Sequence, residues 1–186
     1  LGDFISKQFY EVEGLGVLRS GRPPSDFSHE IPGYQGKCAA WLDVPLADGK
    51  EGRRGSSRVR QAEASAIARE VKRIADSCGP ALSIGVISFY RAQCDLILES
   101  FVDQGLADQD EGEFRIARQY RQTDSGDERL RVGTVDAFQG KEFDLVFLSI
   151  VRANDKVVSD QIDGLERDRL LTGKYGHLRL ANRLNV

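Results

Sequence analysis

One segment of the chain combines polar side chains capable of chemistry with two apolar runs that would hold them in place. Residues 132–152 predict a strand, a polar turn and a second, strongly apolar strand. The polar groups of the turn are Thr134, Asp136, Gln139, Gly140, Lys141 and Glu142. Glycine allows a backbone to approach a phosphate, and a lysine beside it adds positive charge. Residue types alone leave two interpretations open, an anion site or an ordinary solvated loop, and they favour the loop.

The elements around this turn should place it at the edge of a sheet. Apolar side chains recur every three or four residues over 59–75 and 93–102, which predicts two helices with one buried face each. Aliphatic runs predict strands over 84–88, 130–135 and 145–151, and the last is so uniformly apolar that helices are expected on both of its faces. This alternation predicts a three-layer α/β/α domain with a mainly parallel sheet. In such sheets ligands bind beyond the carboxyl ends of strands, where the turn begins.

The rest of the chain is irregular or acidic. A short amphipathic helix is expected over 2–10, from Phe4, Ile5 and Phe9, and irregular loops over 14–57 with a strand candidate at 39–44. Residues 103–129 predict an acidic surface excursion, and 165–171 a short helix. Residues 94–130 hold 4 basic and 10 acidic side chains, so a nucleic-acid surface is expected elsewhere.

Composition excludes several classes of protein. Three dispersed cysteines and two histidines assemble neither a zinc site nor a disulfide framework. Reduced thiols favour the cytoplasm or the nucleus. No apolar run approaches the ~20 residues needed to span a bilayer, so no membrane partner is expected.

Several other residues invite a functional interpretation but favour a plainer one. Trp41 could stack on a base, yet its aliphatic neighbours favour a core position. Cys94 favours a quiet buried thiol, and His177 a surface residue. A basic cluster could bind phosphate, although a solvated loop and helix start, with Ser56 and Ser57 as capping residues, is favoured: Arg53, Arg54, Arg58 and Arg60.

Three motifs, in order, resemble those of superfamily 1 helicases, in the group that contains the nonsense-mediated-decay helicase. Residues 134–142 closely resemble motif V, Thr-Val-Asp-x-Phe-Gln-Gly-[Lys/Arg]-Glu. Residues 84–93 are similar to Ile-Gly-Val-Ile-Thr-Pro-Tyr-x-x-Gln, with Ser88 as the hydroxyl residue and Phe89 in place of the proline. Residues 182–186 look like the opening of motif VI. Residues 3–10 look like the helix that follows Tyr-Arg-Met-His-Pro, so both ends of the chain are expected to lie inside a longer protein.

The resemblance implies that residues 1–186 form a single RecA-like, P-loop NTPase-type domain: the second, C-terminal motor domain of an ATP-dependent DNA or RNA helicase. The residues implied to contact single-stranded DNA or RNA are Ser88, Tyr90, Thr134 and Asp136. Those implied to face ATP are Gln139, Gly140, Lys141 and Glu142. ATP and Mg²⁺ would be held mainly by an N-terminal RecA-like domain, because Gly-x-x-x-x-Gly-Lys-[Ser/Thr] is absent from the chain.

On this interpretation the isolated chain would be inactive. The alternative is a non-catalytic, helicase-like module that docks nucleic acid or protein. The ATP-facing groups of Gln139 and Glu142 favour the enzyme, because a docking module has no need of them.

Overall fold

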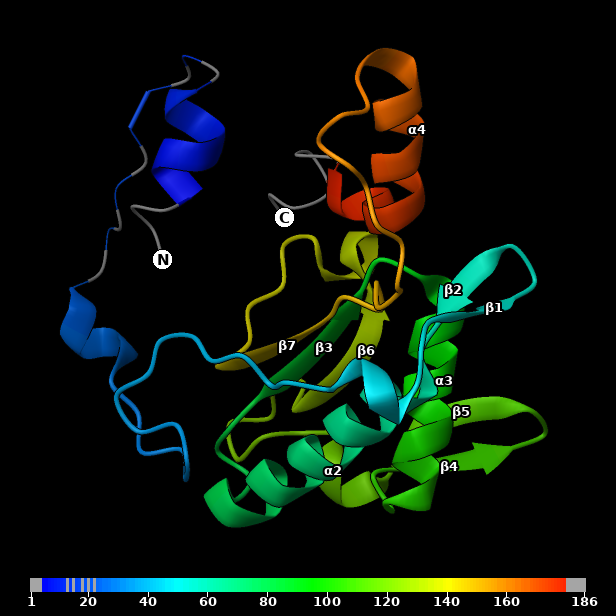
Figure 1. Cartoon of the computed structure of the whole chain (residues 1–186). Helices are drawn as coiled ribbons and strands as arrows, with labels where there is room; N and C mark the ends of the chain where they lie inside the picture. Colours follow the sequence, from blue (N-terminus) through cyan, green and yellow to red (C-terminus); the bar gives the residue numbers. More distant parts are fainter. Residues whose placement is uncertain are drawn as a thin grey trace. The chain divides into compact units, whose positions relative to one another are not determined.

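Three parallel strands form the central sheet of the computed structural model, which describes residues 5–12, 14, 16–17, 19, 21 and 23–179. The strands are β3 (Ile84–Ser88), β6 (Leu130–Thr134) and β7 (Leu145–Ser149), in the order β6-β3-β7 (Figure 1). The strand that comes first in sequence therefore lies in the middle. The three predicted strands, their adjacency and their parallel pairing are confirmed.

Two helices cover one face of this sheet. Helix α2 (Gln61–Cys78) and helix α3 (Arg91–Asp103) pack against each other and against the strands. The face of α2 that is buried carries small and aliphatic side chains: Ala64, Ile67, Ala68, Val71, Ile74 and Ala75. The helix stops before Gly79, whose φ of 72° suits glycine. The two predicted helices are confirmed, each with its apolar stripe toward the sheet, although Val59, predicted to open the first helix, lies in a β-strand.

The opposite face of the sheet is covered only in part. The segment between β6 and β7 contains the short 3-10 helix η5 (Val135–Phe138), and its Phe138 ring lies where a Cβ on Gly85 would be 2.7 Å away. Strand β7 is left open on this side, since Val146 is 43% and Leu148 60% exposed. The expectation that both faces of β7 are covered is therefore wrong for the described residues, because η5 is too short to extend over the edge strand.

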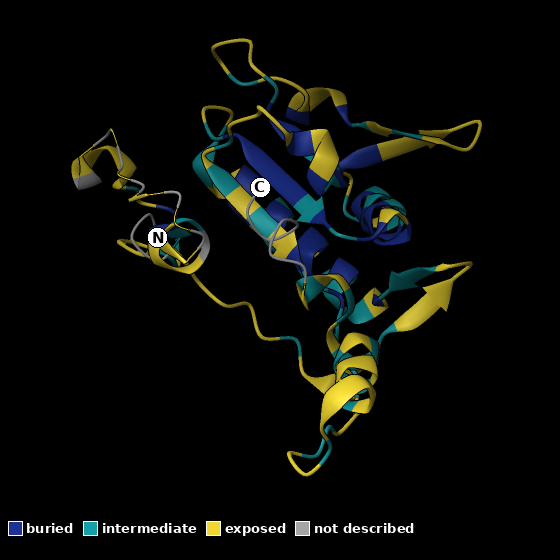
Figure 2. Ribbon diagram, turned by 90° about the horizontal axis from the view of Figure 1, so that it is seen from above, coloured by how far each residue is buried: buried dark blue, intermediate teal, exposed yellow. Residues whose placement is uncertain are grey.

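Two antiparallel hairpins, which the sequence did not predict, accompany the sheet. One pairs β1 (Gly52–Arg54) with β2 (Ser57–Val59), and the other pairs β4 (Ala107–Asp110) with β5 (Glu113–Ile116). The second hairpin and the 3-10 helix η4 (Arg118–Tyr120) lie in the acidic region, where exposed charges agree with the expected surface excursion. Figure 2 shows burial concentrated in the sheet and exposed residues along the hairpins.

After β7 the chain forms helix α4 (Gly164–Tyr175) and the 3-10 helix η6 (Gly176–Arg179). Helix α4 is longer than the predicted 165–171, and none of its residues is buried. No helix within the described ranges is both long and apolar enough to span a membrane.

The residues from Val44 to Arg179 form one compact unit, which also contains the 3-10 helix η3 (Leu46–Asp48), and the described residues before Val44 belong to another. The second unit contains the π-helix η1 (Ser6–Glu11) and the 3-10 helix η2 (Pro24–Phe27). Helix η1 overlaps the second half of the helix that was predicted over residues 2–10. Phe4 and the side chain of Phe9 lie outside what the structure describes.

Two expectations for this second unit are wrong. Residues 39–44 form no strand, and Trp41 is 82% exposed instead of lying in a core. The segment is only six residues long and runs directly into Pro45, which has no N–H for a sheet ladder. Without a neighbouring strand, its alternation of apolar residues has nothing to pack against.

Candidate functional site

Strand register brings three hydroxyl residues into one row across the sheet. Ser88 is the register partner of Thr134 on one side and of Ser149 on the other. All three are the last residues of their strands, so the row lies at the carboxyl edge, where ligands bind in open α/β sheets. The expectation that Ser88 and Thr134 share one sheet edge is confirmed.

The three hydroxyls differ in access to solvent. Ser88 is 1% exposed. Its hydroxyl donates to the Ser149 carbonyl at 3.1 Å and accepts from Tyr90 N–H at 3.3 Å. Thr134 is half-buried and begins η5 without a side-chain capping bond. Thr134 is thus the hydroxyl of the row best placed to meet a ligand, whereas Ser88 holds the backbone of Ser149 and Tyr90.

Tyr90 lies directly beyond β3 but is covered. It is 7% exposed, and its ring centroid is 5.2 Å from that of His177, on η6. Its hydroxyl is buried and has no hydrogen-bond partner within the described part of the chain. A Cβ on Gly176 would come within 2.8 Å of that hydroxyl. A ligand contact by Tyr90 would therefore require η6 to move, and His177 is exposed, as expected.

The turn between η5 and β7 is open to solvent. Asp136 on η5 and the four residues of 139–142 are all exposed. Gly140 has a φ of 73°, a conformation that favours glycine, and no atom crowds its Cα. The Lys141 ammonium lies 3.9 Å from the Glu128 carboxylate. The turn is therefore accessible and contributes little to the core.

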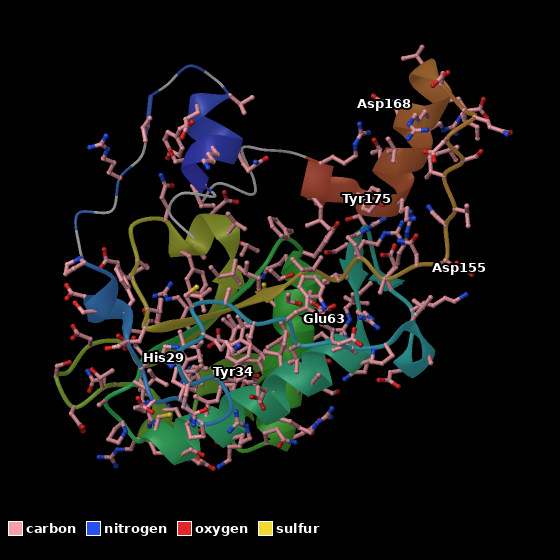
Figure 3. All side chains as sticks on the ribbon, turned by 60° about the vertical axis from the view of Figure 1, so that its left-hand side comes forward. His29, Tyr34, Glu63, Asp155, Asp168 and Tyr175 are labelled. Carbon is pink, nitrogen blue, oxygen red and sulfur yellow. The ribbon has the colours of Figure 1, made fainter. Side chains whose placement is uncertain are left out.

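A buried polar network beneath the row was missed by sequence reasoning. Its acidic member is Glu63, which is labelled in Figure 3. The Glu63 carboxylate accepts from the Ser149 hydroxyl at 2.9 Å and from Val151 N–H at 3.1 Å. Gln93, fully buried, donates to the same hydroxyl at 3.1 Å and accepts from Arg60 N–H at 2.7 Å. The network ties the starts of both helices to the carboxyl end of β7.

A signal for this network was present in the sequence. Glu63 precedes Ile67 by four residues, and Gln93 precedes Ile97 by four, so each polar side chain lies on the core-facing stripe of its helix. The network holds an unusual backbone, since Val151 has a φ of 69°. A β-branched residue in this region is a genuine outlier, of the kind found at functional sites.

In the basic cluster of Arg53, Arg54, Arg58 and Arg60, the side chain of Arg60 does not lie where it was expected. This side chain is 6% exposed and donates to the carbonyls of Val44, Pro45 and Gly49, so the expectation of a solvated position is wrong for it. Neither Ser56 nor Ser57 caps α2, because the N-cap residue is Arg60, which makes no side-chain capping bond. The Ser57 hydroxyl instead accepts from Ala92 N–H in the first turn of α3, because the hairpin packs along that helix.

Cys94 on α3 is an inert thiol. It is 3% exposed, and burial, followed by the nearby Asp95 carboxylate, raises its pKa to about 11. A thiolate is scarcely populated at neutral pH under these conditions, so Cys94 is no nucleophile. The expectation of a quiet buried thiol is confirmed.

The described residues offer polar groups near the turn that could meet a phosphate, but no cluster of metal ligands. Within the described ranges no three His, Cys, Asp or Glu side chains group as ligands for a metal ion. Gly140, Lys141 and the polar side chains beside them could meet a phosphate held by other residues. These residues alone do not enclose a nucleotide.

A parallel α/β sheet with helices on its face and a polar turn at its carboxyl edge defines a RecA-like domain of the P-loop NTPase class. The sequence matches the AAA domain family over residues 1–186, and the chain belongs to that family.

Two curated relatives are similar to it. A regulator of nonsense transcripts 1 homolog from Neurospora crassa is 29% identical over 158 residues, which are 83% of this chain and 13% of the relative. The ATP-dependent helicase NAM7 from Saccharomyces cerevisiae is 31% identical over an alignment of 193 positions, which covers 98% of this chain and 17% of that protein. The chain thus spans less than a fifth of either relative. The resemblance to superfamily 1 helicases of this group is confirmed.

Proposed function

We propose that this chain is the C-terminal motor domain of an ATP-dependent helicase that acts on single-stranded DNA or RNA in the cytoplasm or nucleus. It grips the strand at the carboxyl edge of its sheet and forms one wall of an ATP cleft. An N-terminal RecA-like domain of the same protein supplies the rest of the cleft, including most of the contacts to ATP and Mg²⁺. The printed name of the yeast relative, an ATP-dependent helicase, supports this activity.

The observation that carries the proposal is the adjacency of two polar features. Thr134 ends β6 at the row of hydroxyls, and the exposed turn of residues 139–142 begins only one short helix later. A strand contact and a nucleotide contact are thus joined through η5. A change in the nucleotide cleft would reach the strand through this rigid connection, as a translocating motor requires.

The assignment of residues follows the resemblance to motif V, and the exposure of the turn leaves these groups accessible. Thr134 and Asp136 contact the backbone of the strand, while Gln139, Gly140, Lys141 and Glu142 face ATP. Ser88 holds the end of β7 and the backbone of Tyr90 through its hydroxyl, and Tyr90 would join the strand site only if η6 moved aside. Contacts to the sugar-phosphate backbone carry no base information, so binding is expected to be largely independent of sequence.

The experiment measures strand-stimulated ATP hydrolysis by the full-length protein and its Glu142→Gln and Gln139→Ala variants. Each is expected to reduce turnover on the order of a hundredfold, as the loss of a positioned polar group from a closed cleft does. The free energy of unfolding should change by no more than about 0.5 kcal/mol, because both side chains are exposed. Unaltered turnover would remove the ATP-facing role.

Two further measurements separate the enzyme from a docking module. Thr134→Ala should weaken single-strand binding modestly and to the same extent for every base sequence, whereas a strongly base-dependent loss would contradict a backbone contact. The 186-residue chain alone should hydrolyse no ATP and bind it at best in the millimolar range, about 4 kcal/mol. Strand binding without any ATP turnover by the full-length protein would favour the docking module.

A further inference from the structure

Cationic side chains from three separate segments converge where the chain leaves β7. They come from the β1–β2 hairpin, from the segment after β7 and from the last turn of α4, and we call them the β7-exit patch: Arg53, Arg58, Arg152, Lys156 and Lys174. Two carboxylates lie among them: Glu51 lies close to Arg58 and Arg152, and Asp155, next to Lys156, is paired with Lys50. With Lys50 counted beside the patch, this surface carries six positive and two negative charges, a net charge of four.

Contacts through Glu51 show that these segments meet. Its carboxylate lies 3.4 Å from Arg58 and 3.3 Å from Arg152, and it accepts from the Asn154 amide at 3.1 Å. Arg152 in turn donates to the carbonyl of Lys174 at 2.7 Å. Lys156 donates to the neighbouring Gly173 carbonyl at 3.1 Å. The hairpin, the β7 exit and the C-terminal end of α4 therefore form one surface.

Two features of the hairpin indicate an anionic partner. Arg53 and Arg58 are direct register partners in the antiparallel pair, an arrangement of like charges that destabilises a hairpin. Arg53 is exposed and has no charged partner within the described ranges, whereas the neighbouring Arg54 is paired with Glu99. An arginine pair of this kind, with a free guanidinium, suits a phosphate, which accepts two parallel hydrogen bonds from arginine.

The same surface lies next to the proposed strand site. Ser149, the last residue of β7, is the third member of the hydroxyl row that begins at Thr134. Three neighbouring strands span about 10 Å in the hydrogen-bonding direction. Arg152 follows Ser149 by only three residues, so a polyanion that crosses the carboxyl edge from Thr134 reaches the patch at the other side of the sheet.

We propose that the β7-exit patch binds the phosphate backbone of the same single strand that Thr134 contacts, and so extends the strand site across the sheet to the β1–β2 hairpin and α4. The proposal rests on the proposed function, since it concerns the strand-binding edge of that motor domain. Arg53, Lys156 and Lys174 make the contacts. Arg152, whose side chain is 4% exposed, contributes charge from beneath.

The test compares two double variants of the full-length protein that lose the same charge. Arg53→Ala with Lys174→Ala removes two patch cations that make no side-chain hydrogen bond in the described part of the chain. Arg69→Ala with Arg115→Ala removes two exposed arginines from α2 and β5. Binding of a fluorescently labelled oligo(dT) and oligo(U) of about 15 nucleotides, a length within single-strand site sizes, is measured across a salt series.

The patch variant should lower the slope of log affinity against log salt by about 1.4, since each phosphate contact on a single strand contributes about 0.7. Its loss of affinity relative to the native protein should then shrink roughly sevenfold between 50 and 200 mM salt. Arg53→Lys with Lys174→Arg, which keeps both charges, should preserve the slope, and so should the control variant.

Equal slopes for the patch and control variants would overturn the proposal. If Thr134→Ala still weakened binding in that case, the proposed function would stand and the patch alone would fail. No strand binding by the native protein would refute the proposed function itself. A patch variant that lost affinity for polyglutamate but not for the oligonucleotides would assign the surface to an acidic protein, and would also overturn the proposal.

Discussion

The Glu63→Ala substitution should destabilise the carboxyl end of β7. The carboxylate accepts from the Ser149 hydroxyl and Val151 N–H, and bonds to a charged group contribute about 1.5–3 kcal/mol each, so about 3–6 kcal/mol is lost. Val151 would then leave its φ of 69°, which returns about 1–3 kcal/mol of strain. With the middle of each range, about 4.5 kcal/mol lost and about 2 kcal/mol returned, the net loss is about 2.5 kcal/mol.

The assay is urea unfolding of the full-length protein, monitored with a fluorescent probe in this domain. The control is the Arg69→Ala variant, whose substitution lies on the same helix. The control residue is exposed and should change the free energy of unfolding by less than about 0.5 kcal/mol. The midpoint should fall in Glu63→Ala while the denaturant slope stays constant, as for a simple loss of stability. A cost below about 1 kcal/mol would refute the reasoning, because the network would then hold neither the hydroxyl row nor the strained residue.

Two other expectations concern the core beneath the site. Gly85→Ala places a methyl group 2.7 Å from the Phe138 ring and 3.2 Å from Phe143, so it should cost about 1–3 kcal/mol in urea unfolding and lower strand-stimulated ATP turnover by displacing the turn. Full stability in that variant would contradict the close packing. Cys38, which is exposed, should react with a thiol reagent at pH 8, whereas Cys94, with its pKa raised to about 11, should react only after unfolding. Similar rates for both thiols in the native protein would contradict the burial of Cys94.

The fold was predictable where hydrophobic periodicity was strong. Helix α2 carries apolar residues at three- and four-residue spacing, and β3 is a short run rich in β-branched residues that follows Gly79 and Pro80, so their positions followed from the sequence. The β1–β2 hairpin could not be predicted, because it is built from glycine, serine and arginine and is stabilised by packing on α3. Trp41 shows the converse limit, since an aliphatic neighbourhood in sequence does not provide a neighbouring strand in space.

The candidate site was predictable in its location but not in its support. The carboxyl-edge position of Thr134 followed from the strand-turn-strand pattern, and its alignment with Ser88 agrees with that pattern. The two hydroxyls differ in burial, since Ser88 is buried and Thr134 only half-buried. The sequence did not predict this difference, because it contains no direct measure of which side chain a neighbouring segment covers. Tyr90 illustrates this, because it is covered by residues 176–179, which lie far away in sequence.

Helix α4 is ordered from its C-terminal end rather than by a packed face. It has 12 residues, none of them buried, and a helix of this length is marginal in water on its own. Its last carbonyls accept hydrogen bonds from Arg152, Asn154 and Lys156. A phosphate that binds Lys156, as proposed above, competes with the helix for this donor, so strand occupancy and helix melting would be thermodynamically linked. By reciprocity, the factor by which strand binding changes the melting equilibrium of α4 equals the factor by which melting of α4 changes the affinity for the strand.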